Sequence, residues 1–213
     1  MTLIGDIVRL QIQTTSLKVG DRLARRYDPA GIILVPSLEV DPGGVTGITG
    51  AEVRLDDVHH ADHTHTKSRG TNGVSILFTP HYERMREGLG DHLIDGIAGE
   101  NILVACSAYQ HEADVAAGFR IVTGAGETVE LRRVIVAAPC VEFGRFALRF
   151  PDDQRPDRRV TDAVAFLSDG MRGYYAGYDG SPVRIEVGDH VYRMERAEEN
   201  SVAGARSLGP TYG

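Results

Sequence analysis

Cysteine is scarce in this chain. Only Cys106 and Cys140, of 213 residues, carry a thiol. The chain therefore cannot supply four thiolates to an iron–sulfur cluster or to a four-cysteine zinc site. Redox chemistry in this protein would need electrons from a separate source.

Long apolar runs and a leader-like N-terminus are also lacking. No stretch of eighteen apolar residues occurs, and no basic segment followed by an apolar one opens the sequence. Both absences speak against membrane spanning and export. We expect a cytoplasmic protein that makes no contact with a membrane.

An excess of positive charge is missing as well, because the formal net charge is −7. This balance argues against a general nucleic-acid binder. The arginines are nevertheless unevenly placed, and one region holds Arg145, Arg149, Arg155, Arg158, Arg159 and Arg172. Such a group suits a small anion or a solvated linker, and for 155–159, beside Pro151 and Pro156, we favour the linker.

The sequence does contain many short apolar segments. Strands are predicted at Val8–Gln13, Ile32–Val35, Glu52–Asp56, Val74–Phe78, Ile102–Ala105, Phe119–Val122, Thr128–Val136, Tyr174–Tyr178, Val183–Val187 and His190–Met194. Helices are predicted at Pro80–Leu89 and Val160–Leu167. This pattern predicts a mainly β fold with a few short helices, built as one β barrel over residues 1–195. Residues 196–213, rich in Glu, Ala, Ser and Gly, are expected to form a disordered tail.

Cys140 has the most informative surroundings. The run Val134–Val136 predicts a buried strand, and Pro139, which has no backbone N–H, ends it, so Cys140 is expected at a strand end. Three arginines lie near it in the sequence: Arg132, Arg133 and Arg145. Cations stabilise thiolate, which is a nucleophile and a soft-metal ligand, although a small buried structural cysteine is the alternative. Cys106 has no comparable neighbours and is interpreted as structural.

A series of motifs extends along most of the chain. In order they are Leu89-Gly90, Leu93, Gly96–Val104, Gly118–Ile121, Pro139-Cys140, Gly170–Ala176 and Val187–Asp189. This order resembles the MOSC domain, the module named for the C-terminal part of molybdenum-cofactor sulfurases, over residues 3–195. The stretch Gly44–Gly50 keeps the glycines of a family motif and lacks its aspartate, arginine and histidine.

The resemblance implies a β barrel that acts in molybdenum-cofactor or sulfur chemistry, with Cys140 as the functional cysteine. Members similar to this chain either reduce N-hydroxylated compounds with the cysteine sulfur on molybdenum, or are thought to carry sulfur as a persulfide. The implied cofactor is the molybdenum cofactor (molybdopterin). The family is also associated with pyridoxal phosphate, which we take as an association only.

Other positions match the family more loosely. Glu100 and Asn101 match a glutamate–asparagine pair of the family, in which the asparagine either holds a loop or offers an amide to a pterin. Arg172 and Gly173 suit close approach to a phosphate or pterin oxygen, with a solvated strand-end arginine as the alternative. Arg145 is an anion-binding candidate through its nearness to Cys140.

Histidine is concentrated between Asp56 and His65, where the run DDVHHADHTH holds four histidines and three aspartates. His59 and His63 share a helical face, and His63 and His65 share a strand face, so all three are candidate metal ligands. We favour a loop near the barrel mouth over a closed metal cage. In that loop, beside Lys67 and Arg69, a histidine could instead donate a proton to a substrate.

Two classes of function follow from the sequence. One is a reductase of a small-molecule substrate, with electrons from a separate flavin or iron–sulfur protein. The other is a carrier that exchanges sulfur or cofactor with a donor or acceptor enzyme. A hydrolase is disfavoured because no nucleophile or metalloprotease motif is present.

Overall fold

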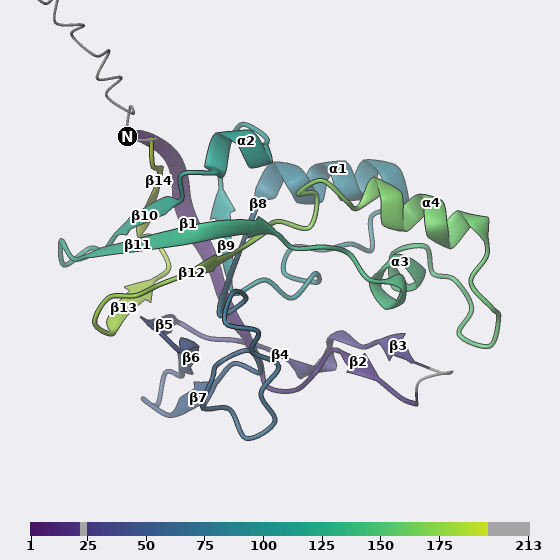
Figure 1. The fold of residues 1–213 in the computed structure, drawn as a ribbon, viewed down its shortest axis with the longest axis horizontal. Coiled ribbons are helices and arrows are strands. Elements are labelled where there is room, and N and C mark those ends of the chain that lie inside the picture. The colour runs from purple at the N-terminus through teal and green to yellow at the C-terminus, as the bar shows by residue number, and fades with distance from the viewer. Residues whose placement is uncertain (22–24, 196–213) are drawn as a thin grey trace, which may run out of the picture.

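The computed structural model describes residues 1–21 and 25–195, and strands dominate it (Figure 1). The strands are β1 (Thr2–Gln13), β2 (Lys18–Val19), β3 (Arg26–Tyr27), β4 (Ile32–Leu34), β5 (Ser37–Asp41), β6 (Gly44–Ile48), β7 (Arg54–Asp56), β8 (Val74–Phe78), β9 (Ile102–Ala105), β10 (Phe119–Val122), β11 (Thr128–Val136), β12 (Tyr174–Gly177), β13 (Val183–Glu186) and β14 (His190–Arg193). The helices are α1 (Thr79–Leu89), α2 (Glu112–Val115), α3 (Val141–Ala147) and α4 (Arg158–Phe166), with a short 3-10 helix at Pro29–Gly31. The predicted tail at 196–213 lies outside the described residues.

A closed barrel forms the centre of the fold. Seven strands follow one another in the order β14–β10–β11–β12–β8–β9–β1, and β1 pairs back with β14 to close the ring. β8 and β9 run parallel, while the other neighbours in the ring are antiparallel. β4 extends the sheet from the far end of β1, and a second sheet has the order β13–β5–β6–β7. The predicted mainly β barrel with a few short helices is confirmed.

Strand β8 shows how apolar residues divide between two cores. Val74, Ile76 and Phe78 belong to the barrel core, whereas Leu77 belongs to a second core that includes residues of α1 and α3. β9 follows the same alternation. Because both faces of these strands are buried, their sequences are apolar apart from Ser75 rather than alternating, which made them visible in the sequence.

Helices α1, α3 and α4 gather on one side of the barrel (Figure 1). The predicted helices at Pro80–Leu89 and Val160–Leu167 correspond to α1 and α4 and are confirmed. α3 was not predicted, and its central Gly144 explains why: a Cβ there would lie 2.7 Å from Cγ2 of Val164 in α4. The glycine thus serves close packing of two helices, although it reads as a helix breaker in the sequence.

The predicted linker is only partly a linker. Residues 151–157 are exposed and non-helical, as expected, but Arg158 and Arg159 already belong to α4. Asp157 caps this helix by accepting a hydrogen bond from the Arg159 amide at 2.9 Å. No helix among the described residues is both long enough and apolar enough to cross a membrane.

Gly5 allows β1 to pair on both sides. The register of β1 against β14 shifts between Leu3 and Gly5, and a Cβ at Gly5 would lie 1.8 Å from the carbonyl oxygen of Ala105 in β9. We expect Gly5→Ala to lower the free energy of unfolding by at least about 2 kcal/mol, because two paired backbones would have to separate. Chemical denaturation measures this, with Gly124→Ala as control, since no described atom lies within 4 Å of its added Cβ. Equal stability of the two variants would contradict the assigned pairing.

Candidate functional site

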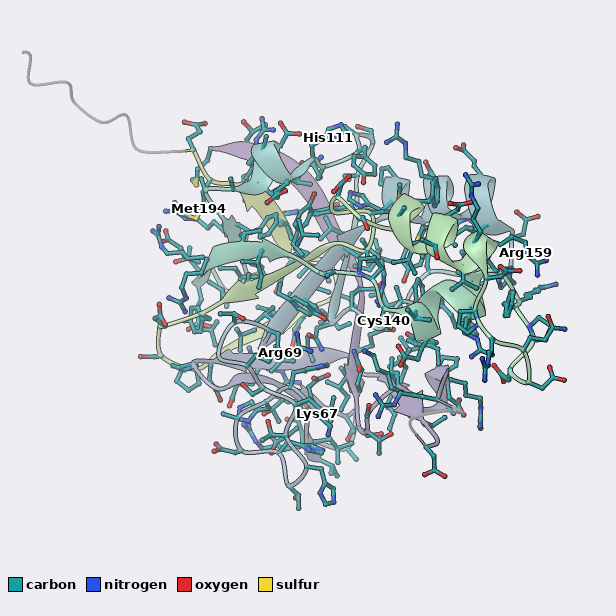
Figure 2. The ribbon with its side chains drawn as sticks, turned by 45° about the vertical axis from the view of Figure 1, so that its right-hand side comes forward. Lys67, Arg69, His111, Cys140, Arg159 and Met194 are labelled. Carbon is teal, nitrogen blue, oxygen red and sulfur yellow. The ribbon has the colours of Figure 1, made fainter. Side chains whose placement is uncertain are left out.

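A cavity of about 460 Å³ opens beside the barrel, between segments that are far apart in the sequence. Its walls come from the link between β11 and α3, the β2–β3 hairpin, and the loop that joins β7 to β8. Figure 2 labels Cys140 at the start of α3 and Lys67 and Arg69 on that loop. The segments meet here because β1 ends at this side of the barrel and the chain turns back through the hairpin.

The cavity is strongly cationic although the chain is acidic. Its described lining includes Lys18, Arg25, Lys67, Arg69 and Arg172, and none of the lining residues that the structure describes is Asp or Glu. Such a concentration of one charge in a recess raises the local concentration of an anion. These charges would not attract a neutral or a cationic ligand.

Cys140 lies in the cavity wall, and its side chain is partly exposed. It is the N-cap of α3 rather than a strand-end residue, because β11 ends at Val136 and a short link follows. The Cys140 sulfur accepts a hydrogen bond from the backbone N–H of Phe143 at 3.4 Å. This bond fixes the sulfur at the start of the helix, and the thiol is left open to a ligand in the cavity.

Cys106 has different surroundings. Its thiol donates to the carbonyl oxygen of Ala108 at 3.3 Å, and it does not line the cavity. Burial raises the pKa of the Cys106 thiol above its ordinary value. The two cysteines should therefore differ in reactivity, with Cys106 the less reactive of the two.

Arg172 is the predicted cofactor-binding residue that the structure places in the cavity wall. Its guanidinium lies 4.0 Å from the centre of the Phe143 ring and donates to the carbonyl oxygen of Ala98 at 2.5 Å. The Nε atom is buried without a hydrogen-bond partner. A cavity-lining arginine whose guanidinium is fixed by stacking is well prepared to bind an oxyanion.

Tyr27 was not predicted as a site residue, but it lines the cavity from the β2–β3 hairpin. Its hydroxyl donates to the carbonyl oxygen of Ile97 at 2.7 Å, and its ring contacts that of Phe143 edge-on with centroids 5.0 Å apart. Burial is the main cause that raises the pKa of Tyr27. Tyr27 is a neutral wall residue, and no local sequence signal marks it.

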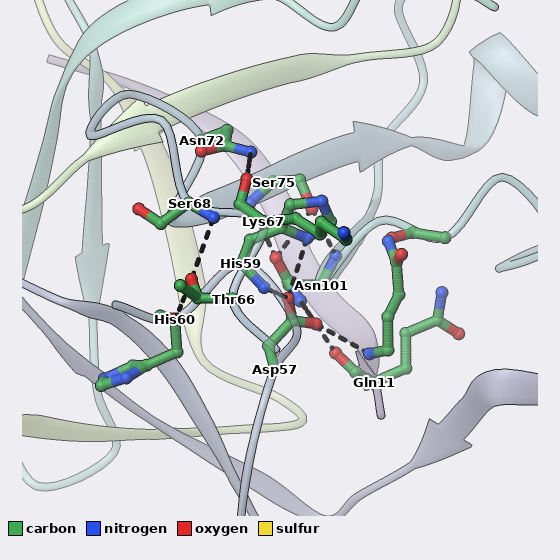
Figure 3. A network of polar contacts seen from close by, with 12 residues as sticks. Gln11, Asp57, His59, His60, Thr66, Lys67, Ser68, Asn72, Ser75 and Asn101 are labelled. Atoms are coloured by element: carbon green, nitrogen blue, oxygen red, sulfur yellow. Dashed lines mark hydrogen bonds and ion pairs between the residues drawn. The ribbon is translucent and has the colours of Figure 1, made fainter. Parts of the chain in front are cut away.

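Asn101 lies next to the cavity rather than in its lining, inside a polar network (Figure 3). Its Oδ1 accepts from the backbone N–H and the hydroxyl of Ser75, at 3.0 and 2.7 Å. Its Nδ2 donates to the Gln11 carbonyl at 3.3 Å and to the Asp57 carboxylate at 3.0 Å. Of the two roles considered for Asn101, the structure shows the one that holds chain segments together.

Glu100 is buried and does not line the cavity. One carboxyl oxygen accepts from the Tyr82 hydroxyl at 2.8 Å, and the other is buried without a partner. Burial raises the pKa of Glu100 to about 7, with Tyr82 and the nearby Arg172 opposing the rise. The side chain is a buried acid that changes charge near neutral pH.

Two further predicted residues lie outside the cavity lining. Arg145 is buried, donates to the Pro151 carbonyl at 2.7 Å and packs against Phe150, so it holds the link before α4. Gly173 has a φ of 79°, and a Cβ there would lie 2.3 Å from the Ile76 carbonyl oxygen. The glycine therefore permits β12 to pair closely with β8.

The histidine-rich tract forms the loop after β7, as predicted, but its residues have different environments. His59 lines the cavity, whereas His60 is buried and bonded to Asp41 at 3.2 Å. His63 and His65 lie at the more exposed end of the loop, with ring centroids 6.4 Å apart. Within 1–21 and 25–195, no group of three or more His, Cys, Asp or Glu is arranged to hold a metal ion.

Comparisons with known proteins bear on the fold. No family model and no curated protein matches the sequence. The structure is similar to the crystal structure of the YuaD protein from Bacillus subtilis, with a TM-score of 0.53 and 17% identity over 90% of this chain and 94% of that one. A crystal structure of a hypothetical protein gives a TM-score of 0.53 at 10% identity, over 92% of this chain and 70% of that one. The fold is MOSC-like. YiiM from Geobacillus stearothermophilus aligns over 93% of this chain and 77% of that one, at 17% identity and a TM-score of 0.45.

Glu100 gives the MOSC-like fold a pH-dependent stability. The unfolded chain loses this proton near the ordinary value of 4.5, whereas the folded protein keeps it until about 7. The stability gained from the protonated form is complete below pH 4.5 and is lost as the pH rises to about 7. We expect the unfolding free energy of Glu100→Gln, relative to the parent, to rise by about 3 kcal/mol across this window.

Chemical denaturation at several pH values measures this difference. Glu83→Gln, on an exposed position of α1, is the matched control and should show no such trend. A parent and a Glu100→Gln protein with parallel pH profiles would contradict the assignment of Glu100 as a buried, protonated acid.

Proposed function

We propose that the cavity binds the molybdenum cofactor with the sulfur of Cys140 as a ligand, and that the protein reduces N-hydroxylated compounds. The observation that carries the proposal is the meeting of a partly exposed Cys140 sulfur with five cationic side chains in one recess whose described lining has no carboxylate. The MOSC-like fold supports the proposal, since the sequence resemblance leads to the same cysteine.

The residues of the cavity fit this cofactor chemically. A pterin cofactor carries a phosphate, for which Lys67, Arg69 and the guanidinium of Arg172 are suitable partners. Cys140 provides a soft sulfur ligand of the kind that a high-valent, sulfur-ligated metal prefers. When bound, the cofactor would supply two-electron chemistry at molybdenum.

In this proposal the electrons come from a separate redox partner. The described residues contain no group of ligands that could hold a metal of their own, and the sequence has too few cysteines for a cluster. A reduced flavin or iron–sulfur protein is the class of partner that this chemistry needs.

The second candidate is a carrier that holds sulfur on Cys140 as a persulfide. The same observation favours it, because the sulfur is accessible and accepts an amide hydrogen bond in a cationic recess. A persulfide bound at Cys140 without molybdenum, found by intact mass spectrometry, would select the carrier over the reductase.

Replacement of Cys140 separates function from stability. We expect Cys140→Ser to lose bound pterin and reduction of N-hydroxylated substrates, in protein made by a host that synthesises the cofactor. Its unfolding free energy should change by at most about 1 kcal/mol, because serine is a good helix N-cap. Cys106→Ser is the control and should keep pterin and activity. A Cys140→Ser protein with full activity would refute the site.

The charge of the cavity can be tested without the cofactor. Iodoacetate carries a negative charge and iodoacetamide none, so the ratio of their rates at Cys140 reports the local field. We expect Lys67→Glu/Arg69→Glu to lower this ratio at least about threefold at low salt, because an anion is no longer attracted. Arg155→Glu/Arg158→Glu, on the exposed link and α4, changes the net charge equally and should leave the ratio unchanged. Equal ratios in the two double variants would show that the cavity field is negligible.

A further inference from the structure

The loop after β7 holds an aspartate–histidine pair at the edge of the cavity (Figure 3). The Asp57 side chain is 0% exposed and that of His59 is 18% exposed. One Asp57 carboxyl oxygen lies 2.9 Å from Nδ1 of His59 and also accepts from the backbone N–H of His59 at 2.8 Å. The other oxygen accepts from the Gln13 backbone N–H at 2.7 Å and from Asn101 at 3.0 Å.

These contacts fix the state of the His59 ring. An ionised carboxylate only accepts hydrogen bonds, so Nδ1 must carry the hydrogen that points at Asp57. Nε2 is then the nitrogen that gains or loses a proton, and no described side chain or backbone group occupies it. A buried acceptor that sets the tautomer and leaves the opposite nitrogen free is the arrangement that proton transfer requires.

The other histidines of the tract lack this combination. His60 uses both nitrogens inside the protein, since Nε2 contacts Asp41 at 3.2 Å and Nδ1 accepts from the Asp62 amide at 3.1 Å. His63 accepts from the His65 amide and lies outside the cavity lining, as does His65. His59 alone among the described histidines lines the cavity together with Cys140 and Arg172.

We propose that His59 is the proton donor to the substrate in this cavity and that Asp57 is its positioning residue. The proposal rests on the proposed reductase function. In the reaction, the N–O bond of R₂N–OH breaks, and two electrons arrive from the reduced flavin or iron–sulfur partner. Nε2 of protonated His59 gives its proton to the departing oxygen, which leaves as water, and a second proton from solvent completes R₂NH.

The tautomer can be measured on the cofactor-free protein. Nitrogen NMR of protein labelled at histidine, with His59→Gln to assign the signals, reports which ring nitrogen carries the hydrogen in the neutral state. We expect Nδ1–H for His59. A neutral His59 with its hydrogen on Nε2 would overturn the proposal, whether or not the protein binds a cofactor.

The kinetic test compares His59→Gln with His63→Gln in protein loaded with cofactor. We expect His59→Gln to keep its pterin content and its KM within about twofold and to lose about a hundredfold or more in kcat per bound cofactor. Added imidazole should restore part of the activity of His59→Ala, and His63→Gln should behave as the parent.

The outcomes separate the two claims. A parent protein that binds no pterin or shows no turnover ends the proposed function, and the proton-donor role with it. An active parent with an equally active His59→Gln protein overturns the role of His59 alone. A loss of activity that only follows a loss of pterin also overturns it, since His59 would then be a binding residue.

Discussion

The buried carboxylate of Asp57 is the contact on which the site depends most. It joins the end of β1 through Gln13, the start of β9 through Asn101, and the loop after β7 through His59. A fully buried carboxylate is stable only when its oxygens accept hydrogen bonds, and here four are made. The barrel and the cavity loop are thus held together by the hydrogen bonds of one buried carboxylate.

The charged side chains of the protein are unevenly distributed. The molecule as a whole is acidic, with a formal net charge of −7, while basic side chains from the hairpin, the loop and the segment before β12 converge on one recess. Arg172 shows how such a charge is fixed: its stacking on Phe143 and its bond to Ala98 hold the guanidinium before a ligand arrives. Preorganised cations of this kind bind an oxyanion at little cost in side-chain entropy.

The sequence predicted those parts of the fold whose local pattern agrees with their final environment. β8 and β9 are apolar apart from Ser75 because both faces are buried, and α1 has its proline in the first turn. β6 was not predicted because Gly47 suggests a turn. In the structure the glycine lies within the strand, where a Cβ would lie 3.0 Å from Ile12. α3 was not predicted for a related reason: Gly144 suggests a helix break, whereas in the structure it allows α3 to pack closely against α4.

The site was predictable only in part. Cys140, Arg172 and the histidine tract stand out in the sequence, and the structure brings Cys140, Arg172 and His59 to one cavity. Lys18, Arg25 and Tyr27 reach it through the β2–β3 hairpin, a contact between distant segments that no local pattern encodes.

X-ray absorption at the molybdenum edge tests the central claim most directly, in protein made by a host that synthesises the cofactor. The account predicts molybdenum with a sulfur shell in the parent and no molybdenum in Cys140→Ser, whereas equal molybdenum with an identical sulfur shell in both, or parent protein without molybdenum, would contradict it.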